Sequence, residues 1–268
     1  MSDDEYFGDP NRVEVTRRAA ELWTLLKSTG KYRYYGRAIG LNGPSDDTAT
    51  EMAALARIQG VGICYYFPKI QAEALFSDLG QAGLITDRHE QYRGGQSAYE
   101  FAKQVLRNRA LPEDVQIKRV DASSCAEFLK DLVHLCESQG VTSVPGSIMR
   151  GISIPGVVYS AVDAAGKPVA SASSHQMVGP DFAHGTDVFW GALATRPDRR
   201  GEGLALYLGA LVIKTMWEDF GARGFITGVR RDNRSSHRLC EKLGVVDTEW
   251  MLAQGIDPDV LGTRRFTK

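Results

Sequence analysis

The sequence predicts an α/β (α+β) fold in which helices flank one mixed sheet. Three observations predict it. The second half of the chain shows segments in the order β-α-β-β-β-α-β-α-β, which is typical of a single sheet with helices packed against it. Hydrophobic residues make up 43% of the chain, enough to bury a core. The length of 268 residues suits two small domains.

In the first half, apolar periodicity and turn residues indicate alternating helices and strands. Helices are expected over 12–27, over 69–80 and over 99–107, and a further helix is expected to follow a cap at Asp46 or Asp47 and to end at about Ile58. Strands are expected over 32–41, 61–67 and 84–93. The segment 108–114 contains Pro112 and has the character of a linker. We therefore predict one domain over 1–112 and a second over 113–268.

The second half has a regular order after this linker. Strands are expected over 115–120, 186–195, 225–230 and 248–253, with two more inside 157–178 joined by a turn at 165–168. Helices are expected over 122–138, 202–220 and 233–243. The stretch 140–156 is rich in Gly, Pro and Ser, so it is not expected to be regular throughout.

Composition excludes several classes of function. The formal net charge is −1, so no basic excess indicates a nucleic-acid partner. The first ten residues are acidic and polar, unlike a signal or transit peptide, and no apolar run is long enough to span a bilayer. The four cysteines lack C-x-x-C spacing, which argues against a zinc site and against a disulfide framework. We expect a cytoplasmic protein without a metal or a membrane partner.

The segment RPDRRGEGLALYLGALVIKTMWEDF, residues 196–220, joins a predicted strand to a predicted helix. A helix N-terminus has unpaired N–H groups and a positive dipole, so it attracts anions. Gly201 and Gly203 lack a Cβ and let a phosphate approach the backbone, while Arg199 and Arg200 add positive charge. The pattern predicts a pyrophosphate site. The pattern G-x-x-x-x-G-K-[ST] is absent, which argues against a nucleotide-hydrolysing loop. The pattern G-x-G-x-x-G is also absent, because Leu206 stands at the position of its last glycine.

Arg200-x-x-Gly203-x-Ala205 resembles the R/Q-x-x-G-x-G/A loop of the GNAT superfamily of acyl-CoA N-acyltransferases, which holds the coenzyme A pyrophosphate. A second stretch, VRRDNRSSHRLCEKLGV at 229–245, is similar to a later motif of that family. The pattern R-x-x-G-x-G also occurs at 57–62, but there it follows a predicted helix and precedes a strand. This order is the reverse of the one that holds a phosphate, so we discard that match. The resemblance covers roughly residues 115–255 and implies a mixed, mostly antiparallel sheet flanked by helices.

The resemblance also implies that acetyl-CoA is the cosubstrate and that an amine attacks its acetyl group directly. The end of the strand before the loop would pair with the pantetheine arm and supply a backbone N–H to the oxyanion. The Asn of the later motif, which is a suitable helix cap, would contact the coenzyme. The implied coenzyme residues are Leu193, Ala194, Thr195, Arg200, Gly201, Glu202, Gly203, Leu204, Ala205 and Asn233.

Two positions differ from the family pattern. Cys240 stands where many members carry a tyrosine that acts as general acid, and Gly228 stands where some carry a catalytic glutamate. A thiol has an ordinary pKa of about 8.5, which suits protonation of the departing thiolate. The alternative is that Cys240 only packs as a small hydrophobic residue.

A base is expected on the strand before the loop, as in another branch of the family. This position is Asp187, whose carboxyl we expect to have a raised pKa at the start of a buried strand. The alternative is an exposed carboxylate at a strand end. His184 and His175 are further candidates because their ordinary pKa lies near neutrality.

Candidate acceptor residues border the variable stretches 141–156 and 179–186. Glu137 is a candidate for binding a substrate ammonium, with an exposed helix-end charge as the alternative. Tyr159 could line the acceptor side. Phe189 and Trp190 alternate on one strand, so one should face the core and the other the acceptor; Trp190 is included as a substrate-binding candidate.

The first half shows the same pattern as the second over a short span. Residues 57–95 and 223–255 both read strand, helix, Leu-Gly, strand, each after a helix. We expect the first half to be a degenerate GNAT-like domain without a coenzyme loop; the alternative is an unrelated extension that shapes the acceptor pocket or a dimer contact.

The expected function is acetyl transfer from acetyl-CoA to the primary amine of a small or amino-acid-like acceptor. The alternatives are a peptide or protein N-acetyltransferase and a non-catalytic acyl-CoA sensor. The oligomeric state stays open, with a homodimer as one option.

Overall fold

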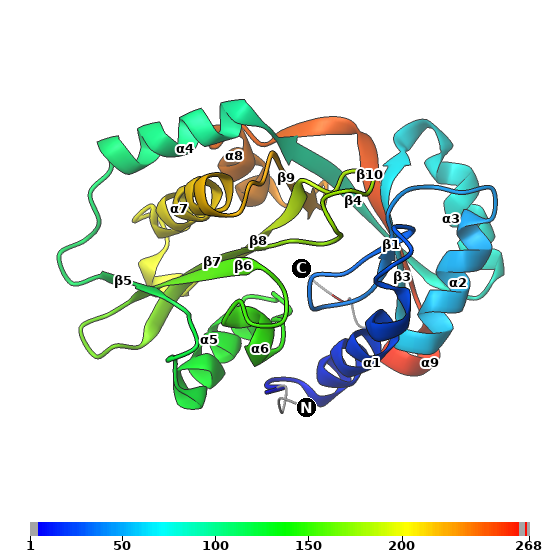
Figure 1. Cartoon of the computed structure of the whole chain (residues 1–268), viewed down its shortest axis with the longest axis horizontal. Coiled ribbons are helices and arrows are strands. Elements are labelled where there is room, and N and C mark those ends of the chain that lie inside the picture. The colour runs from blue at the N-terminus through cyan, green and yellow to red at the C-terminus, as the bar shows by residue number, and fades with distance from the viewer. Residues whose placement is uncertain (1–4, 263–265, 267–268) are drawn as a thin grey trace.

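Ten strands form one continuous sheet, in the order β1-β2-β3-β10-β4-β9-β8-β7-β6-β5, in the computed structural model of the chain (Figure 1). The structure describes residues 5–262 and 266. Two neighbouring pairs, β2 with β3 and β8 with β9, are parallel, and the other pairs are antiparallel. The prediction of a mixed, mostly antiparallel sheet flanked by helices is confirmed.

The first half follows the predicted alternation. Its elements are α1 (Pro10–Leu26), β1 (Tyr32–Arg33), β2 (Gly40–Leu41), α2 (Thr48–Gln59), β3 (Val61–Pro68), η1 (Lys69–Gln71), α3 (Ala72–Gln81), β4 (Ile85–Gly94) and α4 (Gln96–Asn108).

The second half also keeps the predicted order, with short extra helical turns at 146–149, 197–199 and 258–261. Its elements are β5 (Gln116–Arg119), α5 (Ala126–Ser138), α6 (Gly146–Met149), β6 (Gly156–Val162), β7 (Pro168–His175), β8 (Asp187–Thr195), η2 (Pro197–Arg199), α7 (Leu204–Asp219), β9 (Gly224–Val229), α8 (Arg234–Lys242), β10 (Val246–Ile256) and α9 (Pro258–Leu261).

The single strand expected over 32–41 was wrong, because only its two ends are extended. Gly36 has φ 108°, which breaks the extended run. Further on, the side chain of Gln59 accepts from the backbone N–H of Ile39 at 3.0 Å and donates to its carbonyl at 2.7 Å. A buried amide thus replaces the partner strand and keeps this irregular segment inside the core.

Helices cover both faces of the sheet (Figure 1). The helix α7 packs on β6, β7 and β8, and α4 packs on α7. On the opposite face α5 packs on β7 and β8. In the first half α2 packs on β3 and β10, and α3 packs on β4. No helix in the part of the chain that the structure describes is long and apolar enough to cross a membrane.

The two halves exchange their last strands. The strand β10, at the end of the second half, lies between β3 and β4 of the first half. In turn β4 pairs with β9 of the second half, from Glu90 opposite Val229 to Gly94 opposite Phe225. Each half therefore has a parallel pair, β2–β3 or β8–β9, that is completed by a strand from the other half.

The segments β2-α2-β3-α3-β4 and β8-α7-β9-α8-β10 have the same order of elements and the same parallel first pair. In the sheet they are arranged about the β10–β4 contact. This correspondence supports our proposal that the first half, up to residue 112, is a degenerate copy of the fold of the second half. Residues 109–115 contain no helix or strand, and the proposed boundary stays there.

Candidate coenzyme and acceptor site

The loop after β8 reaches α7 through two glycines in the left-handed region. Gly201 has φ 86° and Gly203 has φ 83°, a conformation that other side chains rarely adopt. These turns delay α7, which begins at Leu204 and not at residue 202 as predicted. Gly203 is its N-cap, and no side chain caps the first turn. The arrangement suits an anion, because uncapped amides at a helix N-terminus point toward it.

Arginines hold and surround this loop. Arg199 donates to both carboxylate oxygens of Asp114, at 2.8 and 3.0 Å, and to Glu202 at 2.8 Å. The loop is therefore tied to the segment that joins the two halves. Arg109 of the same segment lies over Gly203, since a Cβ on Gly203 would stand 2.0 Å from its Nη1. A cation thus sits directly at the turn where a phosphate is expected.

The strand before the loop separates from its parallel neighbour. β8 pairs with β9 only from Asp187 to Phe189. Ala192 has φ 51°, and the register with β7 shifts by one residue at the same place, so β8 carries a bulge there. Beyond it, Leu193, Ala194 and Thr195 have no β9 partner on one edge. Their backbone is the part of the strand expected to meet the pantetheine arm.

Asn233 caps α8, as predicted from its place before the helix. Its side-chain oxygen accepts from the backbone N–H of Ser236 at 3.2 Å and from the hydroxyl of Ser235 at 2.9 Å. The cap fixes where α8 begins after β9.

Asp187 is buried and fully engaged. It is 2% exposed and accepts from Arg93 Nε and Nη2, both at 2.8 Å, and from the Tyr66 hydroxyl at 2.7 Å. Burial raises the pKa of this carboxyl, but the hydrogen bonds from Arg93 and Tyr66 and the Arg93 charge outweigh it, so the pKa is lowered. The expectation of a raised pKa was wrong, because the sequence did not reveal a partner from β4.

The two histidine candidates differ. His175 is fully buried, and burial, together with the charge of Arg37, lowers its pKa to about 3, so it is neutral near pH 7 and a poor proton acceptor. His184 is exposed and stacks on Tyr66 with ring centroids 3.8 Å apart. Burial of part of the ring is the largest cause that lowers its pKa. His184 therefore stays the alternative base.

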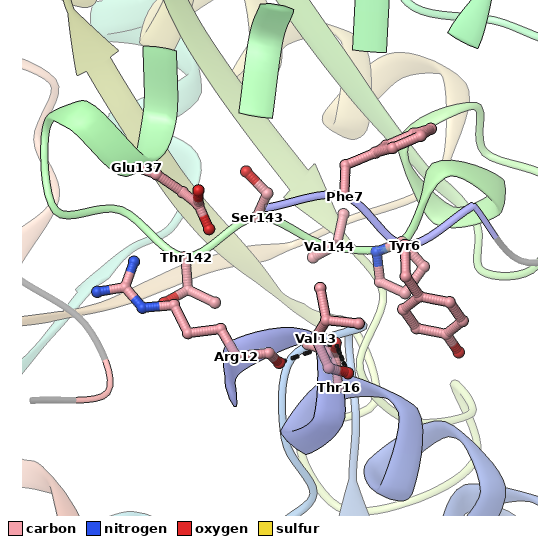
Figure 2. Close-up of a pocket in the computed structure, with 10 residues that line it drawn as sticks. Tyr6, Phe7, Arg12, Val13, Thr16, Glu137, Thr142, Ser143 and Val144 are labelled. Carbon is pink, nitrogen blue, oxygen red and sulfur yellow. Dashed lines mark hydrogen bonds between the residues drawn. The ribbon is translucent and has the colours of Figure 1, made fainter. Parts of the chain in front are cut away.

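Glu137 lies in a pocket between α5 and the N-terminal segment. Its Oε1 accepts from the backbone N–H of Asp9 at 2.8 Å. Figure 2 shows Glu137 and Ser143 on one side of this pocket, with Arg12, Val13 and Thr16 of α1 on the other. A Cβ at Gly8 would stand 2.3 Å from Glu137 Oε1, so the N-terminal segment passes close over the carboxylate.

Two aromatic acceptor candidates face α7. Trp190 is 0% exposed, and its Nε1 donates to the carbonyl of Gly209 at 3.1 Å. The Tyr159 hydroxyl lies 3.2 Å from that of Thr215 on the same helix. The choice of Trp190 for substrate contact is corrected, because the alternation along β8 turns it into the α7 core. Phe189 faces the other way and stacks on Tyr35 at 4.0 Å.

Comparisons with known proteins match this geometry. Residues 148–245 match the model of the acetyltransferase (GNAT) family. Residues 148–245 form a GNAT domain. This match contains the loop, β8, β9 and α8, which are the elements that carried the resemblance in the sequence. No curated protein sequence gives a significant match.

Solved structures share the fold of the whole chain and not only of the GNAT domain. A GCN5-related N-acetyltransferase from Kribbella flavida has a TM-score of 0.54 at 15% identity, covering 91% of this chain and 95% of its own. A GCN5-related N-acetyltransferase-like protein from Streptococcus suis has a TM-score of 0.51 at 18% identity, covering 92% and 100%. A tandem GNAT protein of the clavulanic acid biosynthesis pathway has a TM-score of 0.52 at 13% identity, covering 75% and 66%.

Cys240 of the GNAT domain is packed in the core. It lies in the cluster around α7 and is buried. Burial, with a smaller contribution from Glu241, raises the pKa of the thiol to about 12. This differs from the ordinary value on which its role as general acid was predicted. A thiol that holds its proton so tightly is poorly matched to a departing thiolate.

We expect Cys240→Ala to retain kcat within about twofold, because general acid catalysis contributes about 100-fold or more where it operates. Thiol release from acetyl-CoA measures this. Cys64→Ala is the matched control, since that thiol is also buried with a pKa raised to about 12 but lies on β3 of the first half. A drop in kcat of about 100-fold for the Cys240 variant alone would restore the acid role.

The structure adds two arginines that sequence reasoning missed. Arg109 was assigned to the linker, and no motif spacing connects it with Gly203, which is its neighbour only in the fold. Arg37 lies inside a stretch expected to be a strand, yet its side chain is buried beside Phe189 of the GNAT domain. In the described part of the chain no group of His, Cys, Asp or Glu is arranged to hold a metal ion.

Proposed function

We propose that this protein transfers an acetyl group from acetyl-CoA to the primary amine of a small, amino-acid-like acceptor. The observation that carries the proposal is the uncapped N-terminus of α7 behind the two left-handed glycines. It follows a strand whose pairing with β9 ends after Phe189. A pyrophosphate at the helix and an extended arm along the strand both find unpaired backbone groups there.

The roles of the residues follow from this placement. The loop residues Arg200 to Ala205 bind the pyrophosphate, with Arg109 as an added cation. The backbone from Leu193 to Thr195 holds the pantetheine arm and donates to the oxyanion as the amine attacks. The amine must be neutral to attack. Since the carboxylate of Asp187 is held by Arg93, we assign Asp187 to positioning and leave proton removal to His184 or water.

A non-catalytic acyl-CoA sensor is the second candidate. The observation in its favour is that both predicted proton-transfer groups are engaged elsewhere, Asp187 in an ion pair and Cys240 in the core. We also propose a reducing compartment such as the cytoplasm, because all four cysteines are free thiols. A homodimer stays a prediction.

The test is calorimetric titration with acetyl-CoA, with adenosine diphosphate as the control ligand, followed by thiol release over a panel of amines. We expect acetyl-CoA to bind more tightly than adenosine diphosphate and at least one amine to release free thiol above the hydrolysis rate. Binding without amine-dependent thiol release would favour the sensor. If acetyl-CoA does not bind, both candidates fall.

A further inference from the structure

A second pocket lies between α5 and the sheet, on the face opposite α7. Its empty space is about 310 Å³, a volume that includes space open to solvent. Its walls combine a side chain from the first half, two from α5, two hydroxyls from β7 and the bulge of β8. These are Arg37, Leu132, Cys136, Ser171, Ser173 and Ala192.

Arg37 is the unusual member of this pocket. Its side chain is buried, with 5% of the residue exposed. Among the residues that the structure describes, neither its Nε nor its Nη2 has a hydrogen-bond partner. Its Nη1 donates to the Tyr35 hydroxyl at 3.5 Å. The guanidinium carbon lies 5.5 and 5.1 Å from the ring centroids of Tyr35 and Phe189, which stack on each other.

The other buried arginines of the described residues have closer polar partners within the protein. Arg33 donates to the side chain of Asn42, and Arg230 pairs with Asp87. Arg37 forms no ion pair with any described residue, and no acidic side chain lines its pocket. Burying a charge without a partner is costly, so proteins rarely retain one unless a ligand supplies the partner.

The free edge of Arg37 has the geometry that holds a carboxylate. Nε and Nη2 form one side of the planar guanidinium, which matches the two oxygens of a carboxylate. Arg93 uses the same two nitrogens on Asp187, both at 2.8 Å. Arg37 therefore leaves unused the edge that Arg93 commits to Asp187, and the pocket that it lines is also lined by Ser171 and Ser173.

The pocket also touches the proposed acetyl site. Ala192, which lines it, is the bulge residue directly before the strand end assigned to the pantetheine arm. A ligand held by Arg37 is thus bound on the acceptor side of the same strand. We propose that Arg37 binds the carboxylate of the acceptor, so that the substrate is an amino acid or related amino-carboxylate and not a simple amine. This proposal rests on the proposed acetyl transfer.

The experiment compares three matched series in wild type, Arg37→Met and Arg37→Lys. The series are glycine, glycinamide and methylamine; L-alanine, L-alaninamide and ethylamine; and L-phenylalanine, L-phenylalaninamide and phenethylamine. Thiol release gives kcat/KM, and the shift in unfolding temperature on addition of each compound gives binding without turnover. Arg37→Met keeps the length of the side chain and removes the charge, whereas Arg37→Lys keeps the charge and removes the fork.

In wild type we expect kcat/KM for one of the acids to exceed that for its amide and its amine by about 100-fold. The amide and the amine lack the carboxylate, so they cannot form the charge-assisted bidentate pair with Arg37. Arg37→Met should reduce this preference to within about threefold, with unchanged affinity for acetyl-CoA and no loss of unfolding temperature. The preference of Arg37→Lys for the acid should lie between those of wild type and Arg37→Met. Equal use of acid and amide by wild type, or a preserved preference in Arg37→Met, would overturn the proposal.

Two outcomes separate this inference from the proposed function. If no compound releases thiol but the acids alone raise the unfolding temperature of wild type and not of Arg37→Met, the carboxylate site stands and acetyl transfer fails. If acetyl-CoA is turned over with amines and amides alone, the transferase stands and the carboxylate site fails. If the acids neither bind nor react, the inference is wrong.

Discussion

Gly203→Asp is expected to weaken acetyl-CoA binding by at least about 100-fold, or about 2.7 kcal/mol. An aspartate at the N-cap of α7 would accept from the first-turn amides itself and would repel the pyrophosphate. Its Cβ would also need the space of Arg109 Nη1, which is 2.0 Å from that position. The measurement is calorimetric titration with acetyl-CoA.

The chain offers a matched control for this change. Gly221, just beyond the other end of α7, has φ 71°, and a Cβ there meets no atom within 4 Å. Gly221→Asp therefore carries similar backbone strain and the same charge without touching the loop, and it should retain full affinity. An affinity for acetyl-CoA in Gly203→Asp within threefold of wild type would remove the phosphate assignment.

Arg93→Met is expected to lower the free energy of unfolding by about 3 kcal/mol, the low end for a broken buried pair, because 37% of the Arg93 side chain is exposed. The change leaves the carboxylate of Asp187 buried with Tyr66 as its main partner. Urea unfolding measures the loss. The double variant Arg93→Met with Asp187→Asn should recover part of the lost free energy of unfolding. A loss under about 1 kcal/mol in Arg93→Met alone would show that the ion pair contributes little to stability.

The ion pair between Asp187 and Arg93 also makes the stability of the protein fall at low pH. The pKa of Asp187 is lowered in the folded protein, so its contribution is complete above the ordinary carboxyl pKa of about 4. It is lost as the pH falls through the lower folded value. Asp187→Asn should therefore show a shallower fall in stability below about pH 4 than wild type. Its pH–rate profile near neutrality should match that of wild type, which a catalytic base would not allow.

Local patterns predicted most of the elements and the coenzyme loop. Helical periodicity, the glycines at 201 and 203 and the cap at Asn233 act within a few residues, so they are visible in the sequence. The structure confirms the Asn233 cap, and it shows positive φ at Gly201 and Gly203, which the sequence analysis did not specify. The irregular segment at 34–39 was missed because the side chain of Gln59, twenty residues away, holds it.

Partners that are far apart in the sequence decided what the predictions missed. Asp187 is held by Arg93, 94 residues away, so its surroundings could not be inferred from β8 alone. Alternation showed that Phe189 and Trp190 face opposite sides, but not which one faces α7. No sequence pattern predicts the burial of Arg37, because its burial depends on packing against Phe189 of the other half.

The exchanged strands also bear on how the chain is made. β10 leaves the ribosome well after β3 and β4, yet it lies between these two strands in the sheet. Until it arrives, these two strands have open edges, which are prone to pairing with other chains. Such long-range pairing folds slowly. Neither half can complete its sheet while the other is missing, so the first half separates from the second only by giving up a strand.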